Sequence, residues 1–135
     1  MPTQDTDDIR RLMLDWTAAI EAEDRAGILA GHDPDVLMYD FPNEVRGIEA
    51  YDRTWNFFFA SCAGPITFKA RDIEVTAGDV VAFATCLIRC EGTTAGVVEL
   101  RLTTGFKRVK GEWVITHEHH SVPTVEDALL PAPNK

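Results

Sequence analysis

The chain has 135 residues, 45% of them hydrophobic, and a formal net charge of −9. This length fits one domain, and a chain of this size buries roughly two-thirds of its unfolded surface without needing a metal or a disulfide to fold. The excess of negative charge argues against a nucleic-acid-binding surface, which needs basic side chains to meet the phosphates, and against binding to anionic membranes. We therefore expect neither nucleic acid nor a membrane among the partners.

The cysteines and the apolar segments indicate a cytoplasmic location. The chain has three cysteines, Cys62, Cys86 and Cys90. An odd number of cysteines without the spacing of a disulfide framework is typical of a reducing compartment. Cys86 and Cys90 fall in one predicted strand, about 13 Å apart, too far for a disulfide. The polar, acidic N-terminus does not resemble a signal peptide, and no apolar run approaches the ~20 residues that span a bilayer. We expect three buried thiols.

The first half of the chain predicts three helices and one strand. Asp5 is expected to cap the first helix, whose apolar residues recur at helical spacing: Ile9, Leu12, Met13, Trp16 and Ile20. Asp24 is expected to cap a short second helix over 25–31. A strand over 36–41 then ends at a Pro-Asn turn, and an aromatic-rich third helix follows over 48–61.

The second half changes to the alternating pattern of strands. After Gly64-Pro65 the predicted strands are 66–76, 80–91, 97–108 and 112–122. Three helices followed by long antiparallel strands predict an α+β domain over 1–123, with the helices packed on one face of the sheet. A proline-containing segment over 124–135 is expected to be a tail.

The last hairpin can be placed in register from its turn. Residues 109–111 suit a three-residue loop that ends in glycine, with Arg108 facing Glu112. This register puts Glu118 and His120 on the face that carries the apolar residues of the preceding strand: Leu100, Leu102 and Phe106. A carboxylate and an imidazole on an apolar wall are costly unless they are paired or hydrated. The sequence therefore predicts a small-molecule cavity with a polar floor on this face.

The same register predicts the composition of the outer face of the hairpin: Glu99, Arg101, Thr103, Trp113, Ile115, His117 and His119. Such a face is too apolar to leave wholly in water and too polar for a core, so we expect a homodimer that is built on it. His117 and His119 could begin a metal site, but Arg101 is expected opposite His119 and no third ligand is evident. We expect no bound metal.

Four stretches resemble one known family: 24–28 (Asp-Arg-Ala-Gly-Ile), 33–36 (Asp-Pro-Asp-Val), 45–50 (Val-Arg-Gly-Ile-Glu-Ala) and the closing strand over 111–123. They are similar to segments of SnoaL-like proteins and ketosteroid isomerase homologues of the nuclear transport factor 2-like superfamily. The resemblance covers about 9–123. It implies a cone-shaped fold in which three N-terminal helices pack on a curved antiparallel sheet.

The resemblance also implies roles for individual positions. The family's catalytic aspartate, a general base beside a ketone, falls on Asp40. The family's two donors to the oxyanion fall on Trp16, a weaker donor, and on Leu102, which cannot donate. Two supporting tyrosines fall near His32 and Trp55. Such donors are usually the largest catalytic contribution, so we do not expect a standard steroid isomerase.

The candidate catalytic residues are Asp40, His120 and Glu118, and the candidate ligand-binding residues are Trp16, His32, Tyr39, Trp55, Phe59, Leu102 and Thr116. Asp40 is either a cavity carboxylate or an exposed residue that shapes the turn after it. Glu118 either forms an acid–base pair with Asp40, pairs with a cation, or is solvated. Trp16, Trp55 and Phe59 are either core residues or ligand contacts.

Two functions remain open at this point. The first is an enzyme without a cofactor that performs isomerase-, cyclase- or hydrolase-like acid–base chemistry on a small carbonyl or polyketide-like compound, with Asp40 as the base and His120 or Glu118 as its acidic partner. The alternative is a non-catalytic module for ligand binding or dimerisation, with a vestigial cavity in the extreme case.

Overall fold

The computed structural model describes residues 3–40 and 43–123 of the chain. The elements, in order, are α1 (Gln4–Glu21), α2 (Arg25–Leu29), β1 (His32–Asp40), β2 (Asn43–Arg46), α3 (Ile48–Ala60), β3 (Cys62–Ala77), β4 (Val81–Thr93), β5 (Gly96–Val109) and β6 (Glu112–Ser121). The tail that we expected over 124–135, like the proline of the turn after β1, lies outside the described residues. The short strand β2 was not predicted.

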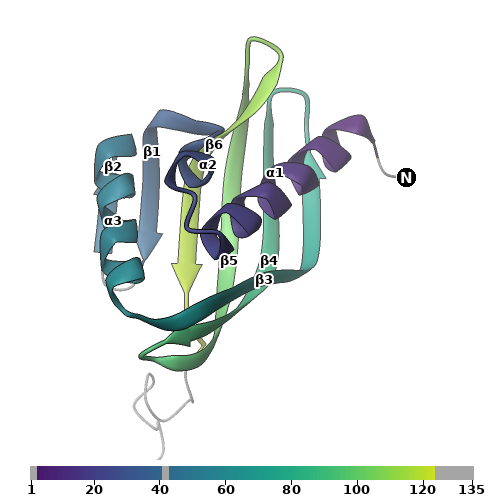
Figure 1. Cartoon of the computed structure of the whole chain (residues 1–135). Helices are drawn as coiled ribbons and strands as arrows, with labels where there is room; N and C mark the ends of the chain where they lie inside the picture. Colours follow the sequence, from purple (N-terminus) through teal and green to yellow (C-terminus); the bar gives the residue numbers. More distant parts are fainter. Residues whose placement is uncertain (1–2, 41–42, 124–135) are drawn as a thin grey trace, which may run out of the picture.

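The six strands form one open, curved sheet in the order β2-β1-β6-β5-β4-β3, with the helices covering one of its faces (Figure 1). The predicted α+β class is confirmed, but the expectation of an antiparallel sheet is wrong in one place. β1 pairs in parallel with β6, while the other neighbours are antiparallel. In the chain, β1 is followed by β2, α3 and β3. In the sheet, the neighbours of β1 are β2 and the last strand, β6, and β3 lies at the opposite edge.

Side-chain hydrogen bonds cap the first two helices, and buried apolar residues pack the first helix against the sheet. Thr3, and not Asp5 as expected, is the N-cap of α1, because its side chain accepts a hydrogen bond from the backbone N–H of Thr6. Asp24 caps α2 as predicted and accepts from the N–H of Gly27. The buried residues of α1 include most of the predicted apolar stripe: Ile9, Met13, Trp16 and Ile20. α1 packs on β3, and α3 packs on β1 and β2.

The register of the β5–β6 hairpin differs from the predicted one. The loop has two residues, Lys110 and Gly111, with φ angles of 52° and 83°, as a type I′ turn requires, and Val109 therefore faces Glu112. Further along, Phe106 pairs with Ile115 but Gly105 pairs with His117, which makes Thr116 the extra residue of a β-bulge.

The bulge changes which side chains of β6 face the helices. Trp113 and Ile115 point inward and are 6% and 3% exposed, so the expectation that they lie on the outer face is wrong. Because Thr116 is an extra residue, Glu118 and His120 also point inward, as predicted. Within the described residues, His119 faces Thr103 and not Arg101.

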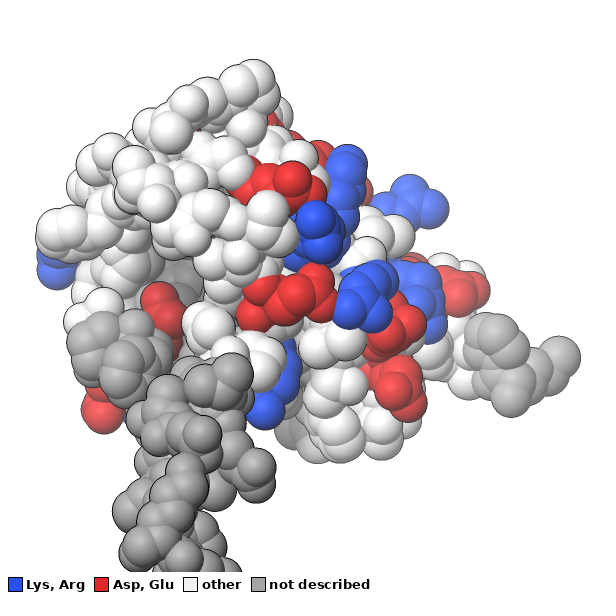
Figure 2. Space-filling view, turned by 90° about the horizontal axis from the view of Figure 1, so that it is seen from below, with Lys and Arg blue, Asp and Glu red and all other residues white. Residues whose placement is uncertain are grey.

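The surface carries charges of both signs. Figure 2 shows acidic and basic side chains next to one another on the face seen from below. Arg71 pairs with Asp72 at 3.2 Å, and Arg89 pairs with Glu91 at 2.7 Å. In the part of the chain that the structure describes, no helix is long and apolar enough to cross a membrane.

Candidate functional site

A cavity of about 250 Å³ lies between α3 and the inner face of the sheet. Most of its wall is apolar: Met38, Trp55, Phe58, Phe68, Cys90, Ala95, Val98 and Leu100. Its polar lining consists of Asp40, Thr54, Ser61, Thr93 and His120. A pocket with a large apolar wall and a few polar groups is the usual form of a small-molecule site.

Asp40 and His120 are the two ionisable groups of this lining besides the thiol of Cys90. Asp40 is half-buried at the end of β1, where the strand leaves the core. His120 projects from β6 and keeps only 8% of its side chain exposed. A carboxylate and an imidazole therefore meet at one cavity from two neighbouring strands.

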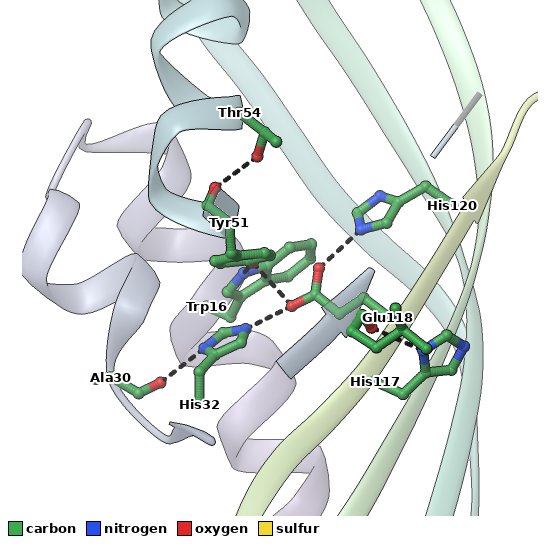
Figure 3. A network of polar contacts seen from close by, with 9 residues as sticks. Trp16, Ala30, His32, Tyr51, Thr54, His117, Glu118 and His120 are labelled. Carbon is green, nitrogen blue, oxygen red and sulfur yellow. Dashed lines mark hydrogen bonds and ion pairs between the residues drawn. The ribbon is translucent and has the colours of Figure 1, made fainter. Parts of the chain in front are cut away.

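Behind the cavity lies a network that is centred on Glu118, which is 1% exposed (Figure 3). One of its carboxylate oxygens, Oε1, contacts Nε2 of His120 at 2.8 Å. The other, Oε2, contacts Nε2 of His32 at 2.5 Å and accepts a hydrogen bond from the hydroxyl of Tyr51 at 2.8 Å. The indole N–H of Trp16 donates to that hydroxyl at 3.0 Å. Both oxygens of the buried carboxylate are thus satisfied.

The network determines the ionisation of its members. Burial alone would raise the pKa of Glu118, but hydrogen bonds and charges from His120 and His32 outweigh it and lower the pKa to about 2. Burial lowers the pKa of His120, and the hydrogen bond and charge of Glu118, with the charge of Asp40, raise it by more, so the net shift is upward. Burial and the charge of Glu118 raise the pKa of Tyr51 well above its usual range. Glu118 is therefore ionised and Tyr51 stays a neutral donor.

The structure divides the predicted site residues into three groups. Asp40, His120 and Trp55 line the cavity. Glu118, Trp16 and His32 belong to the network behind it, where Glu118 contacts His120 but is not part of the cavity lining. Of the alternatives left open for Glu118, the structure favours pairing with cations, because its carboxylate contacts the imidazoles of His32 and His120.

The remaining four predicted contacts lie elsewhere. Tyr39 is 38% exposed on the outer face, where its ring packs edge-on against His117 and His119. Thr116 is the bulge residue and does not line the cavity. Leu102, although opposite His120, is buried in the core. Phe59 packs against the guanidinium of Arg25, and its neighbour Phe58 lines the cavity instead.

Sequence reasoning missed Tyr51 as a member of the site. It lies one helical turn before Trp55 on the same buried face of α3. A phenol on the buried face of a helix needs a hydrogen-bond partner for its hydroxyl, which is the signal that could have found it. The partner, Glu118, is 67 residues away in the chain, so only the fold could supply its identity.

The outer-face histidines do not form a metal centre with other described residues. His117 bonds the backbone carbonyl of Leu37 through Nδ1 at 2.7 Å. Across residues 3–40 and 43–123 there is no group of three or more His, Cys, Asp or Glu side chains that could hold a metal ion.

Comparisons with known proteins support one family. A family model described as a SnoaL-like domain matches residues 9–125. The fold is similar to an NTF2-like protein of unknown function from Pseudomonas putida KT2440, with 30% identity, a TM-score of 0.83, and coverage of 94% of this chain and 93% of that chain. No curated protein matches.

Two more distant structures share the fold. One is a candidate ketosteroid isomerase from Shewanella frigidimarina NCIMB 400, with 18% identity, a TM-score of 0.71, and coverage of 82% of this chain and 92% of that chain. The other is a candidate dehydratase of the NTF2-like family from Streptomyces avermitilis, with 17% identity, a TM-score of 0.76, and coverage of 91% and 99%. A fold of this kind hosts several chemistries, so the chemistry must be argued from the site.

Proposed function

The chain belongs to the SnoaL-like domain family, and from this premise we propose that it binds a small carbonyl compound in its cavity and performs acid–base catalysis on it without a cofactor. The observation that carries the proposal is that Asp40 and His120 line one largely apolar cavity. Their environments differ: His120 has a raised pKa and is bonded to a buried carboxylate, while Asp40 is half-buried at the end of its strand. Pairs of titratable groups in different environments are how enzymes obtain an acid and a base near neutral pH.

The geometry supports separate roles for the two groups. Nε2 of His120 is engaged by Glu118, which leaves Nδ1 as the nitrogen for a ligand in the cavity. The raised pKa of His120 favours its protonated form near neutral pH, so Nδ1–H can donate to the oxygen of a carbonyl group. Asp40 can accept a proton from the carbon next to that carbonyl. The product of this step is an enol, and the reverse transfers return one proton to carbon and one to His120.

The cavity does not reproduce the donor arrangement of a steroid isomerase. The indole N–H of Trp16 is already bonded to Tyr51, and Leu102 has no donor. His120 is therefore the donor that we assign to the carbonyl oxygen. The same observation favours a second candidate function, ligand binding without chemistry, because an oxyanion is stabilised less when the residues at both donor positions of the family cannot donate to it.

The proposal is tested with a panel of cyclic enones and β-hydroxyketones, whose isomerisation or dehydration changes the absorbance of the conjugated carbonyl. Asp40→Asn and His120→Gln are each expected to lower the rate by about 100- to 10,000-fold, since each removes one partner of proton transfer. Matched controls lie on the same strands: Asp35→Asn on β1 and His119→Gln on β6 change exposed residues that do not line the cavity, and should keep the rate.

The two functions give different outcomes in this experiment. Turnover that survives in both Asp40→Asn and His120→Gln contradicts the catalytic proposal. A compound that raises the melting temperature of the wild type but is never turned over identifies a binding protein, since a ligand at 100 times its Kd stabilises the fold by about 2.7 kcal/mol.

A further inference from the structure

Two histidines, and not one, contact the buried carboxylate of Glu118. His120 meets Oε1 from the cavity side, and His32 meets Oε2 from the side of α2 and α3 (Figure 3). The side chain of His32 is fully buried, and its ring lies against that of Tyr51 with the centroids 4.6 Å apart. The catalytic scheme proposed above makes no use of His32, although burying a second imidazole beside Glu118 is expensive unless it has a role in the network.

The protons of the network can be assigned by counting donors and acceptors. Nδ1 of His32 lies 3.3 Å from the backbone carbonyl oxygen of Ala30, which can only accept, so Nδ1 carries a hydrogen. The contact of 2.5 Å between Nε2 of His32 and Oε2 of Glu118 also needs a proton between its two atoms. Tyr51 accepts from Trp16, so the proton of its hydroxyl is directed to Oε2.

Only two assignments satisfy these contacts. Either His32 has hydrogens on both nitrogens and is an imidazolium beside an ionised Glu118, or His32 is neutral and Glu118 is a protonated acid. An ionised carboxylate accepts the hydrogen bonds of His32, Tyr51 and His120 together, which is the arrangement that stabilises its charge. The first assignment is therefore favoured.

We propose that His32 is the resident imidazolium of this network, and that as a positioning residue it neutralises Glu118 and thereby sets how firmly His120 holds its proton. Without the charge of His32, the full negative charge of Glu118 would act on His120 and make it a weaker acid. With that charge, His120 can release its proton to a ligand more readily. The catalytic meaning of this role depends on the function proposed above, but the protonation of His32 does not.

The other charged groups around His120 act in known directions. Asp40 approaches from β1 and favours the protonated form, and Cys90 of β4 lines the same cavity with a thiol whose pKa is raised by burial. α3 contributes Tyr51, which is bonded to Glu118, while α1 and β5 present Trp16 and Leu102, which do not titrate. Among these described neighbours, His32 is the one that adds positive charge.

The test is a pH titration of the histidine rings by long-range proton–nitrogen-15 NMR, which separates imidazolium from each neutral tautomer and needs no substrate. The chain has four histidines, and His117→Gln and His119→Gln assign the two on the outer face. In the wild type near neutral pH, we expect both ring nitrogens of His32 to be protonated. His32→Gln keeps a donor to Glu118 but removes the charge, and should move the titration midpoint of His120 upward by about one pH unit.

Tyr51→Phe is the matched control, because it removes an uncharged hydrogen bond from the same oxygen of Glu118. It should move the midpoint of His120 by clearly less than His32→Gln does. A wild-type spectrum in which His32 is neutral near pH 7, in either tautomer, overturns the proposal, and so does an unchanged midpoint in a folded His32→Gln protein. If His32→Gln does not fold, the wild-type spectrum alone decides. Failure of the catalytic proposal would appear as missing turnover and would leave these spectra unchanged.

Discussion

At the scale of single residues, the site is organised around a buried charge. Glu118 is 1% exposed and has Tyr51 and two imidazoles as partners. Removing a carboxylate from water costs several kcal/mol, and only well-placed partners offset that penalty. Glu118 is therefore better understood as the group that orients and charges His120 than as a group that reacts with a ligand.

We expect Glu118→Gln to lower the free energy of unfolding by about 3 kcal/mol near neutral pH, because it leaves buried imidazoles without their counter-charge. Urea unfolding measures the change. Glu112→Gln, at the exposed start of the same strand, is the control and should change stability by less than about 0.5 kcal/mol. A loss below about 1 kcal/mol for Glu118→Gln would contradict the buried ion pair.

The stability that the pair of Glu118 and His120 contributes should fall at both low and high pH. The pKa of Glu118 falls from 4.5 to about 2 on folding, so its contribution is present above pH 4.5 and is lost as the pH drops toward 2. The pKa of His120 is raised above 6.5, so its contribution is present below pH 6.5 and is lost as the pH rises through the higher value.

The difference in unfolding free energy between wild type and Glu118→Gln should therefore be largest between pH 4.5 and 6.5. Urea titrations at about pH 3, 5.5 and 9 would show a maximum at the middle value. A difference that grows steadily toward alkaline pH would contradict the protonated state that we assign to His120.

At the scale of elements, the bulge in β6 decides the composition of the site. Before Thr116 the strand buries two apolar residues, and after it the strand buries Glu118 and His120. Without the extra residue, strict alternation would send one of these pairs to the outer face. One local irregularity thus lets a single strand contribute both to the core and to the cavity.

Trp113→Ala tests this arrangement. The indole is 6% exposed, its N–H donates to Asp5 at 3.3 Å, and the guanidinium of Arg108 lies 4.2 Å from its ring centroid. We expect the free energy of unfolding to fall by about 3–5 kcal/mol, as for other large core truncations. If Trp113 lay on the outer face, the same substitution would lower the free energy of unfolding far less. Urea unfolding checks the value, with the next residue, Val114→Ala, as a control that should lose about 1 kcal/mol.

At the scale of the whole molecule, the two faces of the sheet carry different kinds of side chains. The inner face carries the core and the cavity, and the outer face carries exposed aromatic and apolar side chains. Phe83 of β4 is 48% exposed, and Tyr39 of β1 is 38% exposed beside His117 and His119. Although Trp113 and Ile115 do not belong to this face, its exposed apolar area still favours association.

We propose a homodimer that buries this outer face. Light scattering at micromolar concentration should give twice the chain mass of 15.0 kDa. Phe83→Glu should yield the monomer, because it would place a charge in the interface, while Phe57→Glu changes a residue of α3 that is 80% exposed and should leave the dimer intact. A wild-type monomer at that concentration would contradict the proposal.

The sequence by itself determined most of the elements and the chemistry that they carry. Local signals predicted α2 with its cap at Asp24, the third helix and the long strands, because caps, turns and periodicity act over a few residues. They also predicted that Glu118 and His120 face inward. That conclusion was right although the predicted turn was wrong, because the shorter loop and the bulge shift the register by two residues in total and restore the original face.

Only the tertiary structure decided which of these groups meet. The parallel pairing of β1 with β6 brings Asp40 to the cavity that His120 lines, and the packing of α3 brings Tyr51 to Glu118. No local pattern contains these pairings, because the partners are far apart in the chain and their contact depends on how the strands are ordered in the sheet. The bulge at Thr116 likewise depends on tertiary packing. Registers with and without the bulge bury different side chains of β6, and packing against α1, α3 and the other strands favours the register that is observed.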